Sequence, residues 1–353
     1  MSNRITGTGC CIPTVVKKNK AFLAHSFLDN QGKEFGVDNQ TIIDKFNSIT
    51  GIKERKYISS ELKTSDIAYH AAQKAIEDAN VDPETINYII IAHNFGDITG
   101  DSKQIDTLPS LASRVKSKLK IRNPKCVAYD ILFGCPGWVE ALIQAHAFIK
   151  AGIAKKCLVI GADALSRVLD IYDRDSMIYA DGAGATILEE SAEEGGILSH
   201  STLTYTAENE TDFIFYGKSY NSKDLKGEKF IKMQGRKVYE FALNHVPTAM
   251  KQCLDHANID IDDLKKIFIH QANKKMDEAI VKRFYRIYKK PMPEHILPMN
   301  IEEFGNSSVA TVPTLFDLVL KQNYKDHSLK KGDTILFASV GAGMNINAIT
   351  YQI

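Results

Sequence analysis

The second half of the chain repeats the order of the first, and this restricts the possible folds more than any other feature. The predicted helix before Asn258 is followed by the same Ala-Asn-x-Asp pattern as the predicted helix before Asn80, 178 residues earlier. Asn306 precedes a predicted helix within Phe-Gly-Asn, as Cys135 does within Phe-Gly-Cys 171 residues earlier. Two ordered matches at nearly equal offsets indicate a duplicated unit.

Within each copy, apolar strand-like runs alternate with helices. Residues 88–92, 156–163 and 333–340 are nearly continuous apolar runs, typical of strands that are covered on both faces. This alternation predicts an α/β fold of mostly parallel sheets with right-handed crossovers. We expect two pseudo-symmetric halves, residues 1–192 and 193–353, packed around a shared core.

Composition excludes several classes of protein. The 353 residues carry a formal net charge of +1 and are 44% hydrophobic, which is ordinary for a globular protein and gives no field for nucleic acid or a membrane. No apolar run is long enough to cross a bilayer, and the start of the chain is strand-like, unlike a signal peptide. The six cysteines form no C-x-x-C pair, which favours reduced thiols in a cytoplasm over disulfides or a zinc site.

Three residues at predicted strand or helix ends form the candidate site. Cys135 lies between a predicted strand and a helix, where unpaired N–H groups and the helix dipole lower a thiol pKa. His270 ends a strand, and Asn306 occupies the position equivalent to Cys135 in the second copy. Each residue alone has a structural explanation: a buried thiol, a satisfied polar group and a turn residue.

As a set, these residues point to chemistry. Ligands bind beyond the carboxyl ends of parallel strands, and a pseudo-two-fold axis would bring Cys135 close to Asn306. A histidine near a thiolate raises its reactivity, and both histidine and asparagine side chains donate hydrogen bonds to a developing oxyanion. The combination predicts covalent catalysis by Cys135 with support from His270 and Asn306.

The motifs around these residues resemble the β-ketoacyl-acyl carrier protein synthase III family, within the thiolase superfamily. The resemblance covers almost the whole chain in the family's order, through residues 50–52, 130–138, 181–185, 269–273, 304–308 and 340–343. It implies a thiolase-like α/β fold with a duplicated five-layer α-β-α-β-α arrangement. It also implies a ketosynthase that forms a carbon–carbon bond by Claisen condensation.

The resemblance implies a role for each residue of the set. Cys135 attacks an acyl thioester and holds the acyl group, while His270 and Asn306 hold the thioester oxygen of a malonyl acceptor as carbon dioxide leaves. The backbone N–H groups of Cys135 and of the turn Gly341, Ala342 and Gly343 would form a second oxyanion hole. No metal or redox cofactor is implied.

Peripheral roles follow from the same resemblance. Leu108 lies where the family places an apolar residue that caps the partner subunit's acyl pocket, which implies a homodimer; the alternative is an ordinary core leucine. Residues 50–57 are predicted to form an exposed, basic turn. A rim for an acidic acyl carrier protein or for coenzyme A would then include Arg55, Asn273, Lys274 and Lys275.

The chain also departs from the family pattern. Ile49 stands where well-known members have an arginine that meets the adenine of coenzyme A, which favours carrier-bound donors. The segments 20–40 and 94–106 are longer than in housekeeping members. Both departures suggest a specialised branch, such as the ketosynthases of aryl-polyene or dialkylresorcinol pathways, in which the acceptor can be a β-ketoacyl thioester.

Other functions fit the sequence less well. A cysteine-dependent acyltransferase without decarboxylation remains an alternative, although the retained Asn306 argues against it. A scaffold subunit would be expected to lack Cys135, and a 3-hydroxy-3-methylglutaryl-type condensation needs a glutamate that residues 94–96 do not supply. The glycine pairs at 182–184 and 341–343 lack the third glycine and the acidic residue of a dinucleotide site.

Overall fold

The computed structural model describes residues 2–99, 104–221, 223, 227–322 and 324–353 and contains two central sheets. The first sheet has the strand order β1-β7-β6-β4-β5 and the second has the order β11-β12-β13-β8. The strands of the first are β1 (Ser2–Cys11), β4 (Tyr88–Ala92), β5 (Val127–Ile131), β6 (Lys156–Ala164) and β7 (Asp181–Ser191). Those of the second are β8 (Gly196–Thr204), β11 (Leu264–Ile269), β12 (Thr334–Gly341) and β13 (Asn345–Gln352).

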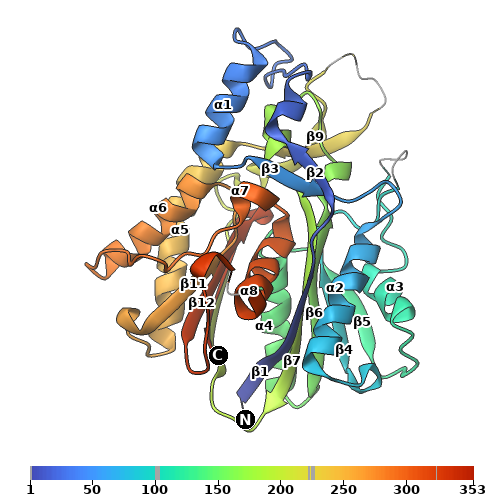
Figure 1. Ribbon diagram of the computed structural model, residues 1–353, viewed down its shortest axis with the longest axis vertical. Helices are drawn as coiled ribbons and strands as arrows, with labels where there is room; N and C mark the ends of the chain where they lie inside the picture. Colours follow the sequence, from blue (N-terminus) through green and yellow to red (C-terminus); the bar gives the residue numbers. More distant parts are fainter. Residues whose placement is uncertain (1, 100–103, 222, 224–226, 323) are drawn as a thin grey trace.

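Helices separate and cover the two sheets, which gives five layers (Figure 1). Helices α4 (Gly137–Lys150) and α8 (Thr311–Gln322) lie between the sheets. Helices α2 (Thr64–Ala79) and α3 (Leu111–Lys118) cover the first sheet from outside. Helices α5 (Gly235–His256) and α6 (Lys274–Ile287) do the same for the second. The thiolase-like five-layer prediction is confirmed.

The prediction of mostly parallel sheets is wrong. Strand β4 pairs in parallel with β5 and β6, and β11 with β12, but the β1–β7, β6–β7, β12–β13 and β13–β8 pairs are antiparallel. The turn at 342–344 that joins β12 to β13 shows why, because a parallel crossover needs a dozen or more residues. Apolar runs reveal that a strand is buried on both faces, but not its direction.

The two sheets repeat the same strand order, because β1-β7-β6-β4 corresponds to β8-β13-β12-β11. The counterpart of β5 is reduced in the second half. There, among the described residues, the N–H of Ile267 in β11 donates to the carbonyl of Ile296 at 2.8 Å, in place of a full fifth strand. The segment that follows leads to Asn306, just as β5 leads to Cys135.

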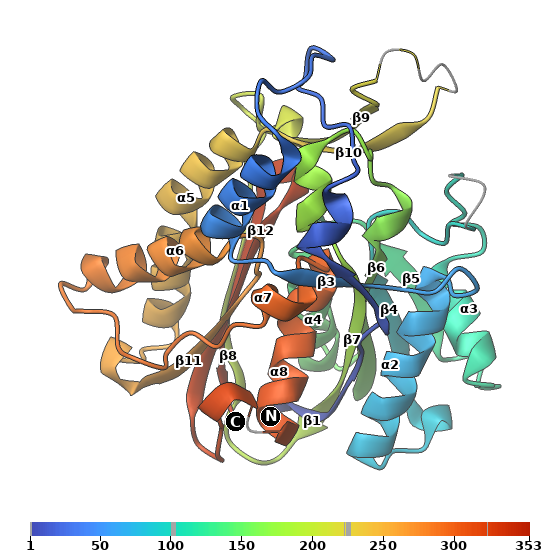
Figure 2. The same ribbon diagram turned by 45° about the horizontal axis from the view of Figure 1, so that its top comes forward.

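Shorter elements gather at one end of the molecule, above the ends of the central strands (Figures 1 and 2). Residues 50–57 do not form the exposed turn that the sequence suggested, because β3 pairs with β2 in an antiparallel ribbon. The elements at this end are α1 (Asn39–Thr50), α7 (Ile301–Phe304), β2 (Val15–Lys18), β3 (Glu54–Tyr57), β9 (Ile214–Lys218) and β10 (Lys229–Met233).

Candidate active site

Local turns place the three predicted catalytic residues. Cys135 lies between β5 and α4, directly after Gly134, whose φ of 65° is a left-handed conformation that suits glycine. Asn306 lies between α7 and α8, directly after Gly305, whose φ is 69°. His270 follows β11, and its backbone N–H donates to the carbonyl of Ala338 in β12 at 2.9 Å. All three residues therefore end elements of the central layers.

These three residues line one cavity of about 220 Å³, which we call the inner cavity. The structure therefore brings Cys135, His270 and Asn306 together, as predicted from the duplication. Apart from polar groups near the cysteine, most of the wall is apolar and includes Phe95 and Ile231. This arrangement gives a mainly apolar cavity in which electrostatic interactions are strengthened.

Ser308 contacts the predicted catalytic residues through three different groups. Its hydroxyl donates to the sulfur of Cys135 at 3.4 Å, and its backbone N–H donates to Oδ1 of Asn306 at 2.8 Å. Its carbonyl accepts from the hydroxyl of Thr311 at 3.0 Å, and this hydroxyl also bonds Nδ1 of His270 at 2.7 Å. Ser308 has a φ of 53°, an uncommon left-handed conformation that is frequent at functional sites.

A buried polar chain leads to the Ser308 hydroxyl. The Nδ2 group of Asn94 donates to Oδ2 of Asp163 at 2.6 Å and to the hydroxyl oxygen of Ser308 at 3.0 Å. Because that oxygen accepts from Asn94, its own hydrogen is free for the sulfur of Cys135. Sequence reasoning missed this chain. Its three members come from distant segments, and only the second serine of the Phe-Gly-Asn-Ser-Ser motif pointed to it.

The thiol of Cys135 is neutral at rest, contrary to the sequence-based expectation. Burial raises its pKa from 9.0 to about 12, and the hydrogen bond from Ser308 and the residue's own backbone N–H offset only part of this effect. Desolvation penalises the thiolate more than the helix start stabilises it. The prediction of a lowered thiol pKa is therefore wrong.

The hydrogen bonds of Thr311 assign the tautomer of His270. The single hydroxyl hydrogen of Thr311 is donated to the carbonyl of Ser308, so its oxygen accepts from Nδ1–H of His270. Burial lowers the pKa of His270 to about 4, so the imidazole is neutral. In this tautomer Nε2 carries a lone pair and is a proton acceptor.

The turn predicted to complete the second oxyanion hole lies against the cysteine. A Cβ atom on Gly341 would be 2.5 Å from the backbone nitrogen of Cys135, and one on Gly134 would be 2.7 Å from the nitrogen of Ala342. Only glycine permits this approach of the two backbones. Gly343, with a φ of 76°, completes the turn.

Comparison with known proteins identifies the family. Two family models match, 3-oxoacyl-[acyl-carrier-protein] synthase III over residues 129–206 and its C-terminal domain over residues 254–353. The β-ketoacyl-[acyl-carrier-protein] synthase III of Staphylococcus aureus is 32% identical over 338 residues, which cover 96% of this chain and 98% of that protein. The chain belongs to this synthase III family.

Further relatives agree with this assignment. The enzyme of the same name from Clostridium perfringens is 34% identical over 304 residues, which cover 85% of this chain and 87% of that protein. The crystal structure of 3-oxoacyl-[acyl-carrier-protein] synthase III from Aquifex aeolicus superposes over 100% of both chains with a TM-score of 0.81 and 27% identity. The predictions of a ketosynthase of this family and of an acyl-transferring condensing enzyme are confirmed.

In this synthase III family member a second, larger cavity of about 600 Å³ adjoins the inner one. We call it the outer cavity; it shares Asn306 and Met276 with the inner cavity. Its wall is mainly apolar and includes Ile49, the residue that replaces the expected arginine. Three basic residues that sequence reasoning did not single out also line it, namely Lys45, Arg174 and Arg236.

Arg55 does not belong to a rim of the synthase. It is fully buried, and burial lowers its pKa to about 10. Its guanidinium donates to the carbonyl of Met177 at 3.0 Å, to the carbonyl of Lys17 at 2.9 Å and to Oδ1 of Asn19 at 2.7 Å. The assignment of Arg55 to a carrier-binding rim is wrong, because this side chain anchors the N-terminal ribbon to the segment beside the site.

The other predicted rim residues lie at the start of α6. Asn273 lines the outer cavity and caps the helix, since its side-chain oxygen accepts from the N–H of Met276 at 3.1 Å. Lys274 is partly buried against Gly51, and Lys275 is exposed. Asn273 thus reaches the outer cavity, and Lys275 is the accessible cation of this group.

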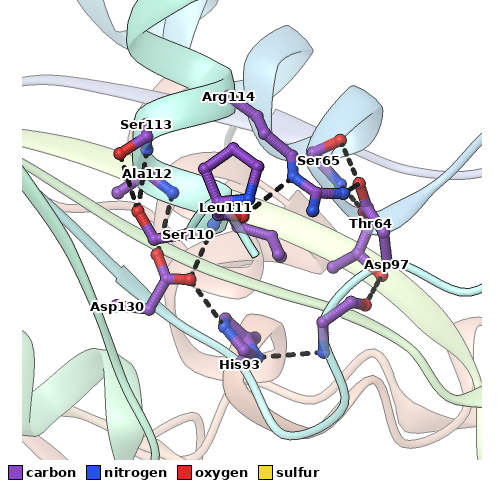
Figure 3. Close-up of polar contacts among 12 residues, drawn as sticks. Thr64, Ser65, His93, Asp97, Ser110, Leu111, Ala112, Ser113, Arg114 and Asp130 are labelled. Atoms are coloured by element: carbon purple, nitrogen blue, oxygen red, sulfur yellow. Dashed lines mark hydrogen bonds and ion pairs between the residues drawn. The ribbon is translucent and has the colours of Figure 1, made fainter. Parts of the chain in front are cut away.

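Leu108 is 89% exposed in the single chain and lines neither cavity. The alternative of an ordinary core leucine is therefore wrong. A polar cluster beneath α3 holds the loop that contains Leu108 (Figure 3). Arg114 bridges Asp97 at 2.8 Å and Asp106 at 2.7 Å, and Asp106 accepts from the N–H of Leu108 at 3.3 Å. Residues 100–103 of the long loop noted in the sequence lie outside the described residues.

The same cluster ties the loop to the first sheet. Asp130, at the end of β5, accepts the backbone N–H groups of Leu111 and Ala112 at 2.6 and 2.8 Å and bonds Nε2 of His93 at 3.0 Å (Figure 3). The carboxylate thus stabilises the N-terminus of α3. The loop that presents Leu108 is fixed from both sides.

Within the part of the chain that the structure describes, no group of three or more histidine, cysteine, aspartate or glutamate side chains is arranged to hold a metal ion. None of the described helices is both long and apolar enough to span a bilayer.

Proposed function

We propose that Cys135 is the nucleophile of this condensing enzyme and that His270 and Asn306 act on the acceptor. One observation carries the proposal: a single cavity holds a thiol, a neutral imidazole and an amide whose oxygen is already satisfied by Ser308. The amide oxygen is engaged, so the Nδ2 hydrogens of Asn306 remain as donors for a substrate oxygen.

In the first half-reaction the sulfur of Cys135 bonds to the acyl carbon, and the carbon–sulfur bond of the donor breaks. The thiol proton passes to Nε2 of His270, which is unprotonated at rest, and from there to the departing thiolate. Because the thiol pKa is about 12, this transfer accompanies the attack and does not precede it. The backbone N–H of Cys135 and the turn 341–343 would stabilise the acyl oxygen as it becomes negative.

In the second half-reaction the acceptor becomes a carbanion. A malonyl acceptor loses carbon dioxide, and Nδ2 of Asn306 donates a hydrogen bond to the enolate oxygen. For His270 to donate to the same oxygen, the imidazole proton must move from Nδ1 to Nε2. The hydroxyl of Thr311 then donates to Nδ1. A β-ketoacyl acceptor loses an α-proton to Nε2 of His270 instead. In either case the carbanion bonds to the acyl carbon, and the bond between that carbon and the sulfur of Cys135 breaks. The departing thiolate takes back a proton, which comes from His270 with a β-ketoacyl acceptor and from solvent with a malonyl acceptor.

The substrates in this proposal are acyl thioesters, with the acceptor carried by an acyl carrier protein. The outer cavity leads to Asn306, and its apolar wall with Lys45, Arg174 and Arg236 suits an apolar arm that ends in a phosphate. Lys275 adds an exposed cation for an acidic carrier surface. Carrier binding that did not weaken with added salt would contradict this electrostatic component.

A homodimer is part of the same proposal. Strand β5 is the edge of the first sheet, and Val127 and Leu132 at its two ends are 45% and 69% exposed. With Leu108 they form exposed apolar surface beside an unpaired edge, which commonly marks an interface. A monomer in light scattering at micromolar concentration would contradict the homodimer.

A cytoplasmic location is proposed because the reaction needs Cys135 as a free thiol.

The decisive experiment is acylation followed by intact mass. Incubation with acyl-coenzyme A and acyl-carrier-protein donors of several lengths is expected to add one acyl group per chain. Cys135→Ala should abolish the adduct and lower condensation by a thousandfold or more, roughly, because the covalent step is lost. Cys11→Ala, at another partly exposed free cysteine, is the matched control and should retain the adduct.

Acceptor assays separate the remaining alternatives. Adding malonyl- or β-ketoacyl-carrier protein to the acyl-enzyme should release a condensed product with one of the two. If no thioester donor labels Cys135, its proposed role as the nucleophile fails and a scaffold role is favoured. Release of the acyl group to an alcohol or amine without a new carbon–carbon bond would instead support the acyltransferase alternative.

A further inference from the structure

The hydroxyl of Tyr179 is a polar group of the inner cavity that the proposed reaction does not use. Tyr179 is 6% exposed and lines the cavity with Cys135, His270 and Asn306. Its hydroxyl makes no hydrogen bond with the described residues, and it is not one of their fully enclosed, unpaired polar atoms. The hydroxyl therefore keeps accessible surface and is open to a partner that enters the cavity.

Backbone contacts fix Tyr179 beside the reacting groups. The N–H of Asn306 donates to the carbonyl of Ile178 at 3.0 Å, and the N–H of Ala180 donates to the carbonyl of Asn306 at 2.8 Å. These two bonds form a bridge that places Tyr179 alongside Asn306. Ile178 lines the outer cavity, whereas Tyr179 lines the inner one, on the same side as the thiol.

The hydroxyl is a donor, and the ring that carries it packs among apolar side chains. Tyr179 belongs to a core cluster with Leu165 and Ile178, against which Phe95 and Ile231 also pack. Burial, together with the negative charges of Asp175 and of a Cys135 thiolate, raises the pKa of Tyr179 well above 10. The phenol therefore keeps its hydrogen at any pH at which the enzyme would work.

Apart from the hydroxyl of Tyr216, the other polar side chains of the inner cavity already have partners or roles. The Asn94 amide is bonded to Asp163 and Ser308, and the Ser308 hydroxyl is bonded to the thiol. Asn306 and His270 serve the acceptor thioester, and the backbone near Cys135 serves the acyl oxygen. An unsubstituted hydrocarbon chain would leave the Tyr179 hydroxyl desolvated and unpaired, which is unfavourable.

We propose that the Tyr179 hydroxyl donates a hydrogen bond to an oxygen substituent of the substrate, so that the enzyme takes acyl thioesters with a keto or hydroxyl group close to the thioester. This inference rests on the proposed function and specifies its substrate class. Because Tyr179 lies beside Asn306 and on the thiol side, the oxygen is expected within a few carbons of the reacting carbonyl. A site built to bond such a group discriminates against the analogue that lacks it.

The test compares matched substrates in matched variants. Wild type and Tyr179→Phe are each given carrier-bound 3-oxoacyl, 3-hydroxyacyl and unsubstituted acyl donors of one chain length, and kcat/KM for the Cys135 adduct is measured by intact mass. Wild type should prefer an oxygenated donor, and Tyr179→Phe should lower that preference about tenfold, the usual effect of one hydrogen bond. Tyr285→Phe is the control, because the hydroxyl of Tyr285 is buried and unpaired among the described residues but lies in the core around α6, away from the cavity.

A second arm identifies which substrate carries the oxygen. The acyl-enzyme of an unsubstituted donor is given 3-oxoacyl or malonyl carrier protein, and the product is measured; a selective loss with 3-oxoacyl acceptor in Tyr179→Phe assigns the contact to the acceptor. Binding of the same thioesters to full-length Cys135→Ala, with and without Tyr179→Phe, reports the contact without acyl transfer.

The outcomes keep the two proposals separate. Absence of any Cys135 adduct defeats the proposed function, while the binding arm still reports on Tyr179. An adduct that forms equally well from oxygenated and unsubstituted donors, with acceptor use and binding ratios unchanged in Tyr179→Phe, overturns the inference alone. An equal loss for every substrate in Tyr179→Phe also overturns it, because that pattern indicates a structural role.

Discussion

The turns before α4 and α8 occupy equivalent positions in the two halves, yet they hold their functional side chains differently. Both follow a glycine in the left-handed conformation, Gly134 and Gly305, and both face the inner cavity. Among the described residues, the side chain of Cys135 makes one weak hydrogen bond to another side chain, the 3.4 Å bond from Ser308. Asn306 is held by backbone bonds to Ile178 and Ala180 and by the 2.8 Å bond to its side-chain oxygen.

This difference matches what the two residues would do. A nucleophile must move toward a substrate carbon, so a loosely held thiol is suitable. A donor to an oxyanion gains most from being fixed before charge develops, because no reorganisation is then required. The duplicated fold thus supplies one side chain with few hydrogen bonds and one with several at the same topological position. Ser308, from the second turn, contacts both.

The largest expected effect that tests this division comes from Asn306→Ala. Removal of one pre-oriented donor should lower condensation by about 10²- to 10³-fold. Acylation of Cys135 should change by less than about threefold, because Asn306 serves only the acceptor in this proposal. Single-turnover measurements of the adduct and of the product separate the two steps.

Asn306→Asp is the informative companion variant. It keeps the size of the side chain and an oxygen for the N–H of Ser308, but it replaces the donor by an acceptor. Its condensation should be as slow as that of the alanine variant. Parallel losses in acylation and condensation in both variants would show that the two turns do not divide the work.

The sequence predicted which residues form the site better than it predicted the contacts among them. Cys135 and Asn306 could be predicted because the repeated order of motifs reveals the duplication. His270 could be predicted because it ends an apolar run. The hydrogen bonds among Asp163, Asn94 and Ser308 depend on how three distant segments pack, which no local pattern encodes. The raised thiol pKa likewise follows from burial and not from the neighbouring residues.

Arg55 shows why the charge pattern near the site led to a wrong prediction of a carrier-binding residue. A basic stretch usually indicates a solvated surface, but β3 pairs with β2 and turns this side chain inward beneath Gly305. A guanidinium with three acceptors satisfies its hydrogen bonds without water. The prediction of mostly parallel strands was wrong for a related reason, since buried strands have the same apolar sequence pattern whether they run parallel or antiparallel.

The pH dependence of alkylation tests how the first turn treats its thiol. The thiolate is the reactive form, and a pKa of about 12 means that its population rises with pH throughout the accessible range. Iodoacetamide labelling of Cys135 should therefore accelerate roughly tenfold for each pH unit from 7 to 10, without a plateau. Peptide mass spectrometry measures the rate at this residue.

A small-molecule thiol supplies the reference for this experiment, because its rate levels off above its own pKa near 8.5. Labelling of Cys135 that is fast and constant between pH 6 and 8 would show a thiolate at rest. That result would favour the helix N-terminus over burial as the dominant influence. It would also make the two turns more alike than the structure indicates.

The smallest expected effect is that of Ser308→Ala. This variant separates the contact of Ser308 with the thiol from its contact with Asn306. The variant loses the hydroxyl that donates to the thiol, but it keeps the backbone N–H that holds Asn306 and the carbonyl that accepts from Thr311. Acylation should slow by about five- to tenfold, the value of one modest hydrogen bond to a developing thiolate. Condensation of a preformed acyl-enzyme should change by less than about twofold.

Ser307→Ala is the matched control, since the neighbouring serine is also buried but makes no side-chain hydrogen bond among the described residues. Ser308→Gly adds a second comparison, because glycine adopts the φ of 53° without strain and should be at least as stable to heat as Ser308→Ala. If Ser308→Ala slowed condensation as much as acylation, the hydroxyl would also position Asn306. The thiol and the amide would then be coupled through one side chain, and not held independently by the two turns.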